Sequence, residues 1–103
     1  MSKYNLNIFK QLLDTDYTLQ ELENKILEIL KLHKGHVNVF SISGMIIDTA
    51  LEEGRIIGQV KNAQYWDYSP SDSANEKVFK VLQKLAIEQK ILYCFNSSFK
   101  LWE

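Results

Sequence analysis

A chain of 103 residues, 46% of them hydrophobic, is long enough for one domain with its own core. Its formal net charge of −1 provides no general attraction to nucleic acid or to an anionic membrane. A single cysteine rules out an internal disulfide, and no apolar run is long enough for a signal peptide or a membrane span. We therefore expect one domain, residues 1–103, in an intracellular (cytoplasmic) protein that does not contact a membrane.

The two halves of the chain differ in charge. Residues 1–54 hold 5 Lys or Arg and 8 Asp or Glu, a net charge of −3. Residues 55–103 hold 7 and 5, a net charge of +2. If the protein has a nucleic-acid face, we expect it in the second half.

The first predicted element is a short amphipathic helix over residues 4–13. Its apolar residues fit a helical repeat better than an alternating strand: Leu6, Ile8, Phe9, Leu12 and Leu13. A helix in this position would lie over the core or against a second copy of the chain. Leu6, Phe9 and Leu13 are therefore candidate contacts in a homodimer.

A capping box marks the start of the next helix. In the motif Thr18-x-x-Glu21, each side chain bonds the free backbone amide of the other residue. The apolar spacing then continues to Lys34. Residues 36–40 alternate as a short strand, and another helix is expected over residues 44–53, capped by Ser41 or Ser43 and ended by Gly54.

Residues 55–70 carry two strand-like runs, 55–60 and 64–68. An unstructured loop of this length is uncommon inside a small domain, so the segment is either an inserted hairpin or part of a different α+β fold. It also holds three aromatic residues, Tyr65, Trp66 and Tyr68. Such rings can stack on bases or anchor a protein interface, although they pack more often on the domain's own core.

The end of the chain predicts a helix over residues 73–89 and a hairpin over residues 91–102. Pro70 and Ser71-Asp72-Ser73 mark the start of the helix, whose outer face carries Lys77, Lys80 and Lys84. A β-rich run then reaches Phe95, and Asn96-Ser97-Ser98 supplies turn residues before the return strand.

The order of these elements resembles the winged-helix (winged helix-turn-helix) superfamily, over most of the chain. The resemblance implies an α+β winged helix with an extra N-terminal helix and an inserted hairpin at 55–70. Residues 73–89 would be the recognition helix and 91–102 the wing. Residues 76–102 are similar to Z-DNA-binding domains in the Trp near the end of the wing, Trp102, but Phe79 and Gln83 stand where those domains carry Asn and Tyr.

A second resemblance is to winged helices of the endosomal sorting machinery, which bind other proteins. It rests on residues 32–34 near a helix end and on Ser97-Ser98-Phe99 before a terminal Trp.

These features predict a small DNA-binding regulator of transcription or replication, with double-stranded DNA as its partner. Lysines would meet phosphates and polar side chains would meet base edges. The candidate nucleic-acid residues are Ser73, Asn75, Lys77, Lys80, Gln83, Lys84 and Lys100. Three lysines equally suit a solvated helix face. The alternative function is a protein-interaction module that docks a partner through the wing or through Tyr65, Trp66 and Tyr68.

Nothing in the sequence predicts an enzyme, a metal site or a cofactor. His33 and His36 are separated by Gly35, which interrupts the helix that would present both, and Cys94 lies in an apolar run. The acidic residues have no nucleophile or base in their sequence context, and there is no Gly-rich phosphate loop.

Overall fold

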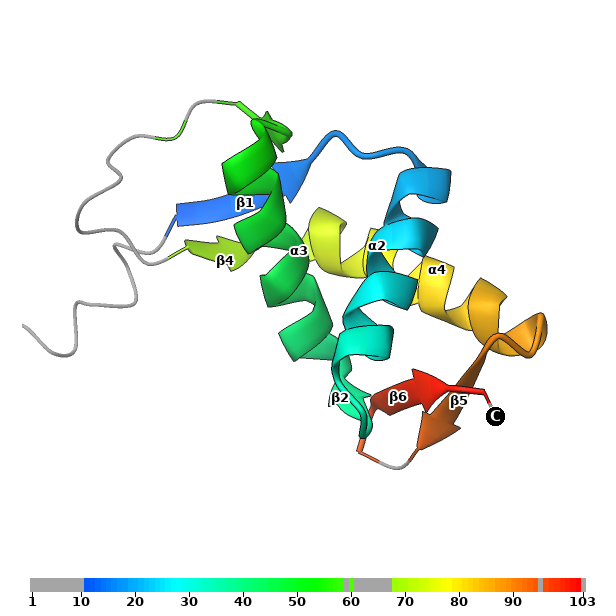
Figure 1. The fold of residues 1–103 in the computed structure, drawn as a ribbon. Coiled ribbons are helices and arrows are strands. Elements are labelled where there is room, and N and C mark those ends of the chain that lie inside the picture. The colour runs from blue at the N-terminus through cyan, green and yellow to red at the C-terminus, as the bar shows by residue number, and fades with distance from the viewer. Residues whose placement is uncertain (1–10, 59, 61–67, 95, 103) are drawn as a thin grey trace, which may run out of the picture.

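A computed structural model describes residues 11–58, 60, 68–94 and 96–102. The described residues form an α+β fold, as predicted, in which three helices lie with two small sheets, each of three strands (Figure 1). Among these helices, none combines the length and the apolar character needed to cross a bilayer.

Helix α2 (Leu19–Leu32) confirms the predicted capping box. Thr18 Oγ1 accepts a hydrogen bond from the Glu21 amide at 3.1 Å, and Glu21 Oε1 accepts one from the Thr18 amide at 2.8 Å. The helix ends two residues before the predicted Lys34. This difference is within the usual uncertainty of a helix end.

Helix α3 (Val39–Glu53) begins five residues earlier than predicted. Its cap is Asn38, whose Oδ1 accepts a hydrogen bond from the Phe40 amide at 2.8 Å, in place of Ser41 or Ser43. Only Val37–Asn38 remain as strand β2 of the strand predicted over 36–40. The end is as predicted, since Gly54 takes a left-handed conformation with a φ of 69°, which glycine adopts without strain.

Helix α4 (Asp72–Ile87) is capped by Ser71, whose Oγ accepts a hydrogen bond from the Ala74 amide at 3.1 Å. It is therefore the predicted helix shifted toward the N-terminus by one or two residues. The hairpin that follows, β5 (Ile91–Cys94) and β6 (Ser98–Leu101), is antiparallel and confirms the prediction. Strand β2 pairs with β6 on the other side, giving the order β2-β6-β5.

The other sheet is built on β1 (Gln11–Thr15), which was predicted as the end of a helix. Leu13 is 2% exposed, whereas Leu12 is 64% exposed, so neighbouring residues face opposite sides, as in a strand. The predicted helix is therefore wrong for residues 11–13. Residues 4–10 lie outside the part of the chain that the structure describes.

The described residues of the segment 55–70 do not form the predicted inserted hairpin, and most of its second predicted run, residues 64–67, lies outside the part of the chain that the structure describes. Its two described strands, β3 (Ile56–Ile57) and β4 (Tyr68–Pro70), do not pair with each other, because β1 lies between them. Strand β3 is antiparallel to β1, and β4 is parallel to it. The strand signals in this segment thus came from long-range pairing, which a local pattern does not specify.

The main core joins all three helices to the terminal hairpin. Its largest fully buried side chains are Leu22, Ile26, Leu30, Ile42, Leu82, Leu85 and Ile91, each at most 2% exposed. A smaller cluster, Leu13, Ile47 and Ala74, joins β1 to α3 and α4. Because α4 contributes to both clusters, its position is fixed at both ends.

A polar network around Arg55 holds β1, α2 and β3 together. Arg55 forms ion pairs with Asp16 at 2.6 Å and with Glu21 at 2.8 Å, and its guanidinium lies 4.8 Å from the centre of the Tyr17 ring. Hydrogen bonds from Arg55 lower the pKa of Glu21 to about 2. Burial, with a hydrogen bond to Glu53, raises the pKa of the Tyr17 hydroxyl above its ordinary value.

Candidate functional site

The predicted nucleic-acid residues do not form one surface, because the exposed side of α4 divides into two edges. The contacts of Lys77 and Lys84 place one edge beside β1 and α2. Phe79 and Gln83 lie on the other edge, where they face the terminal hairpin. Lys100 lies apart from both, near the end of α2.

Two of the three lysines predicted to bind phosphates from α4 are already paired with carboxylates. Lys77 Nζ lies 3.2 Å from Asp14 Oδ2 and 3.3 Å from the Thr15 carbonyl oxygen. Lys84 Nζ lies 2.8 Å from Glu23 and 3.0 Å from Glu88, and these two hydrogen bonds raise the pKa of Lys84. Lys80 has no ion pair within the described residues.

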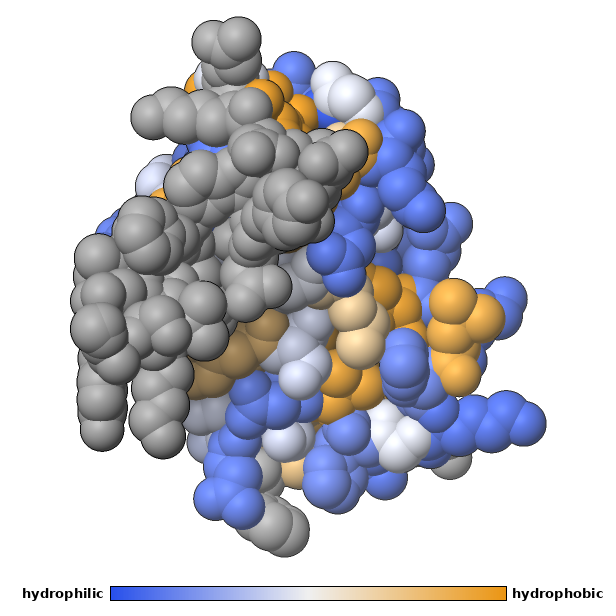
Figure 2. Space-filling model, turned by 90° about the vertical axis from the view of Figure 1, so that its left-hand side faces the viewer, coloured by the Kyte–Doolittle hydropathy of each residue, from blue (hydrophilic) through white to orange (hydrophobic). Residues whose placement is uncertain are grey.

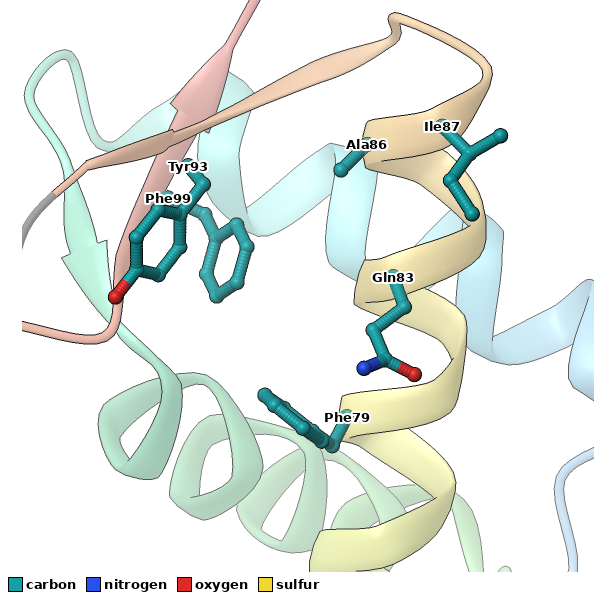
Figure 3. Close-up of a pocket in the computed structure, with 6 residues that line it drawn as sticks. All are labelled: Phe79, Gln83, Ala86, Ile87, Tyr93 and Phe99. Carbon is teal, nitrogen blue, oxygen red and sulfur yellow. The ribbon is translucent and has the colours of Figure 1, made fainter.

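A largely apolar hollow of about 490 Å³ separates α4 from the terminal hairpin (Figure 3). Figure 3 shows Phe79, Gln83 and Ala86 pointing from α4 toward the rings of Tyr93 and Phe99 on the hairpin. These two rings meet edge to face, with centroids 5.3 Å apart. Phe79 is 47% exposed and Tyr93 58% exposed, so large aromatic surfaces remain open to solvent.

A second hollow of about 350 Å³ continues the first toward the start of α3. Phe79 lines both hollows, and we call the pair the α4 groove. The second is lined by Val39, Phe40, Asn75, Glu76, Phe79 and Ser97. The Oδ1 atom of Asn75 is buried there and receives no hydrogen bond from any described residue.

The start of α3 is held against the hairpin turn by two hydrogen bonds. Asn38 Nδ2 donates to the Asn96 carbonyl at 3.0 Å, and the Val39 amide donates to the Ser97 carbonyl at 2.9 Å. Asn96 and Ser97 accommodate the turn with φ angles of 62° and 56°. Phe40, which is 67% exposed, is thereby placed at the end of the α4 groove.

A different surface surrounds Lys100. It lines a hollow of about 230 Å³ between the end of α2 and β6, with Leu30, Lys31, His33, Lys34, Gly35 and Leu101. We call Lys31, His33, Lys34 and Lys100 the basic cluster. In the part of the chain that the structure describes, none of its three lysines forms an ion pair.

The residues predicted for a protein interface have other positions. Leu6, Phe9, Tyr65 and Trp66 lie outside the described residues. Leu13 is buried with Ile47 and Ala74, and Tyr68 packs partly buried against the same cluster. On the face shown in Figure 2, apolar side chains reach the surface and are bordered by hydrophilic residues.

Sequence reasoning missed four exposed apolar residues of the α4 groove: Phe40, Phe79, Ile87 and Tyr93. Phe40 was assigned to a strand and Tyr93 to the apolar run of the hairpin, so neither was a surface candidate. Ile87 is 83% exposed, which a simple helical projection of residues 73–89 would have shown. Within the described residues, no three metal-binding side chains lie together.

Comparison of the chain with protein-family models, with curated proteins and with solved structures found no match.

Proposed function

We propose that the protein is a non-catalytic interaction module of the winged-helix type, whose α4 groove binds an amphipathic helix of a partner protein. The order α2-β2-α3-α4-β5-β6, with the sheet order β2-β6-β5, supports the winged-helix assignment. In this arrangement α4 corresponds to the recognition helix and the terminal hairpin to the wing. The sheet on β1 is then an addition to the fold.

The observation that carries the proposal is the apolar surface left open in the α4 groove. Phe79, Ile87 and Tyr93 each expose close to half or more of their surface, and all three line the same hollow. Contiguous exposed apolar surface of this kind marks interaction sites in small proteins. Aromatic side chains are also enriched at the centres of protein interfaces.

The length and charge of the α4 groove favour a short amphipathic helix with a basic residue near one end. From Asn75 to Ile87 the groove follows α4 for about 18 Å, the length of a helix of about 12 residues. Such a helix would place apolar side chains at i, i+3 or i+4, and i+7 against Phe79 and Tyr93. Glu76 lines one end and has no ion pair within the described residues, so it favours a Lys or Arg on the partner helix.

A peptide selection tests the proposal. Peptides that bind the wild-type protein would be selected from a random library of helix-length peptides. Those that also bind the Phe79→Lys variant would then be discarded. We expect the enriched peptides to share a helical apolar spacing with a basic residue near one end. Their affinity should fall at least tenfold on Phe79→Ala or Tyr93→Ala, because an interface anchor contributes more than about 1.4 kcal/mol.

Leu19→Ala is the matched control, since Leu19 is 58% exposed but lies at the start of α2, outside the α4 groove. It should leave peptide affinity unchanged. If the removal step on Phe79→Lys leaves no enriched peptide, every selected binder uses another surface, and the proposal is contradicted. Self-association that blocks the groove, which sedimentation of the free protein would show, would also contradict it.

A second candidate function is binding of duplex DNA by α4, in a regulator of transcription or replication. The observation that favours it is Lys80, which is exposed and has no ion pair among the described residues, and which lies two helical turns after the exposed Ser73 on the same side of α4. Lys80→Gln should weaken binding to duplex DNA and reduce its salt dependence by about one counterion. Phe79→Ala should leave that binding unchanged, which separates the two functions.

A further inference from the structure

The basic cluster joins Lys100 to two lysines, Lys31 and Lys34, that are distant from it in sequence. Lys31 lies in the last turn of α2, Lys34 follows this helix, and Lys100 lies on β6. They meet because α2 packs against β6, with Leu30 of α2 in the core that Leu101 of β6 packs against. All three line the same hollow of about 230 Å³.

The positive charge of the cluster is not neutralised by the described part of the chain. Lys25, Lys77, Lys84 and Lys90 each have a carboxylate partner within 4.0 Å, but Lys31, Lys34 and Lys100 have none there. The partial negative charge at the carbonyl end of α2 can explain why Lys31 and Lys34 lie there. It does not account for Lys100, which comes from another element.

An exposed indole lies on the same face of the hairpin as Lys100. The Trp102 amide donates to the Lys90 carbonyl at 3.1 Å, so the antiparallel register of β5 and β6 continues to Trp102. Alternate residues of a strand share a face, which puts Trp102 on the side of Lys100. Trp102 is 47% exposed, and Leu92, opposite Lys100, is 38% exposed.

From this combination we propose that the basic cluster and Trp102 form a second binding site, for single-stranded nucleic acid. Lysines alone would suit any polyanion, including an acidic peptide. An exposed indole beside them favours a ligand that carries aromatic rings between its charges. A single strand offers such rings for stacking, whereas a duplex keeps its bases stacked on each other.

The second site is separate from the α4 groove. Phe99 and Tyr93 face α4 from one side of the hairpin, and Lys100 alternates to the other side. The two surfaces can therefore be occupied at the same time. The module would then hold a protein helix on one face of its hairpin and a nucleic-acid strand on the other.

The test compares two triple variants that change the net charge equally. Lys31→Gln/Lys34→Gln/Lys100→Gln removes the three lysines of the basic cluster, whereas Lys25→Gln/Lys77→Gln/Lys84→Gln removes three lysines that are paired with carboxylates away from the hairpin. Fluorescence anisotropy would follow a labelled oligothymidylate of about 12 nucleotides, and an oligouridylate of the same length, at about 50 mM salt. Circular dichroism would check that both variants are folded.

We expect the affinity of the wild-type protein to fall as the salt concentration rises. The logarithm of the association constant should fall with the logarithm of the salt concentration with a slope near −2, as for about three phosphate contacts to a single strand. The cluster variant should lose at least tenfold in affinity and most of this slope, whereas the control should stay within about threefold of wild type. Trp102→Ala should lose about tenfold and Trp102→Phe much less, because phenylalanine still stacks. Whether the DNA or the RNA strand binds more tightly identifies the source of the ligand.

Three outcomes would overturn the proposal. One is the absence of oligonucleotide binding by wild type at low salt. Another is an equal loss in the two triple variants, which would mean that only net charge matters. The third is equally tight binding of poly-glutamate or duplex DNA with no effect of Trp102→Ala, because the site would then recognise charge without bases.

Discussion

Arg55 shows how one side chain can set the local geometry of three segments. It pairs with Asp16 before α2 and with Glu21 in the first turn of α2, and its own backbone leads into β3. Glu21 also completes the capping box with Thr18, so its carboxylate has two roles. The sequence predicted the capping role from spacing alone. It could not predict the second role, because Arg55 is distant in the chain.

The Glu21 carboxylate makes a pH-dependent contribution to stability. Hydrogen bonds from Arg55 lower its pKa from 4.5 to about 2 in the folded protein. A depressed pKa stabilises the fold above the unfolded value of 4.5, and this stabilisation is lost as the pH falls through about 2. Urea unfolding of wild type and Arg55→Met at several pH values should show a difference that is largest near pH 6–7 and shrinks from about pH 5 downward. A difference independent of pH would contradict this role.

At the scale of elements, short sequence motifs correctly predicted several helix ends and the hairpin, which depend on neighbouring residues. The capping box, the Gly54 stop, the helix at Ser71 and the terminal hairpin are all found, because each depends on residues close together in the chain. The sheet on β1 was missed because its pairing joins residues 11–15 to residues 56–57 and 68–70. A short run with adjacent leucines fits a helix and a strand equally well.

Two neighbouring leucines test the observed strand. Leu13→Ala should lower the free energy of unfolding by about 2–5 kcal/mol, because it empties part of the cluster with Ile47 and Ala74. Leu12→Ala should change it by less than about 0.5 kcal/mol, because Leu12 is 64% exposed. Chemical denaturation of the two variants measures both values. Equal losses would favour a buried helix at residues 11–13 instead.

The exposed aromatics of the α4 groove should contribute little to folding, in contrast to the core beneath them. Phe79→Ala should change the free energy of unfolding by less than about 1 kcal/mol, whereas Leu85→Ala, on the buried side of α4, should cost about 2–5 kcal/mol. Thermal and urea unfolding provide the comparison. A large loss for Phe79→Ala would show that its ring belongs to the core and not to a binding surface.

At the scale of the whole molecule, the structure divides one predicted surface into three. The predicted DNA-binding set was drawn from a helical projection, which shows that residues are exposed but not what lies beside them. In the fold, Lys77 and Lys84 face carboxylates of β1 and α2, Gln83 faces the hairpin, and Lys100 joins the end of α2. The sequence could not predict this division, because it depends on which elements pack beside α4 in the fold.

The most direct test of the α4 groove is to map a selected peptide on the protein by the amide chemical shifts of the described residues. Binding in the groove predicts the largest changes at Phe79, Gln83, Ile87 and Tyr93, with little change at Lys31, Lys34 and Lys100. The same titration on Phe79→Ala should show weak or no shifts. Changes centred on the basic cluster, or on the edge of α4 beside Asp14 and Glu23, would contradict docking in the α4 groove.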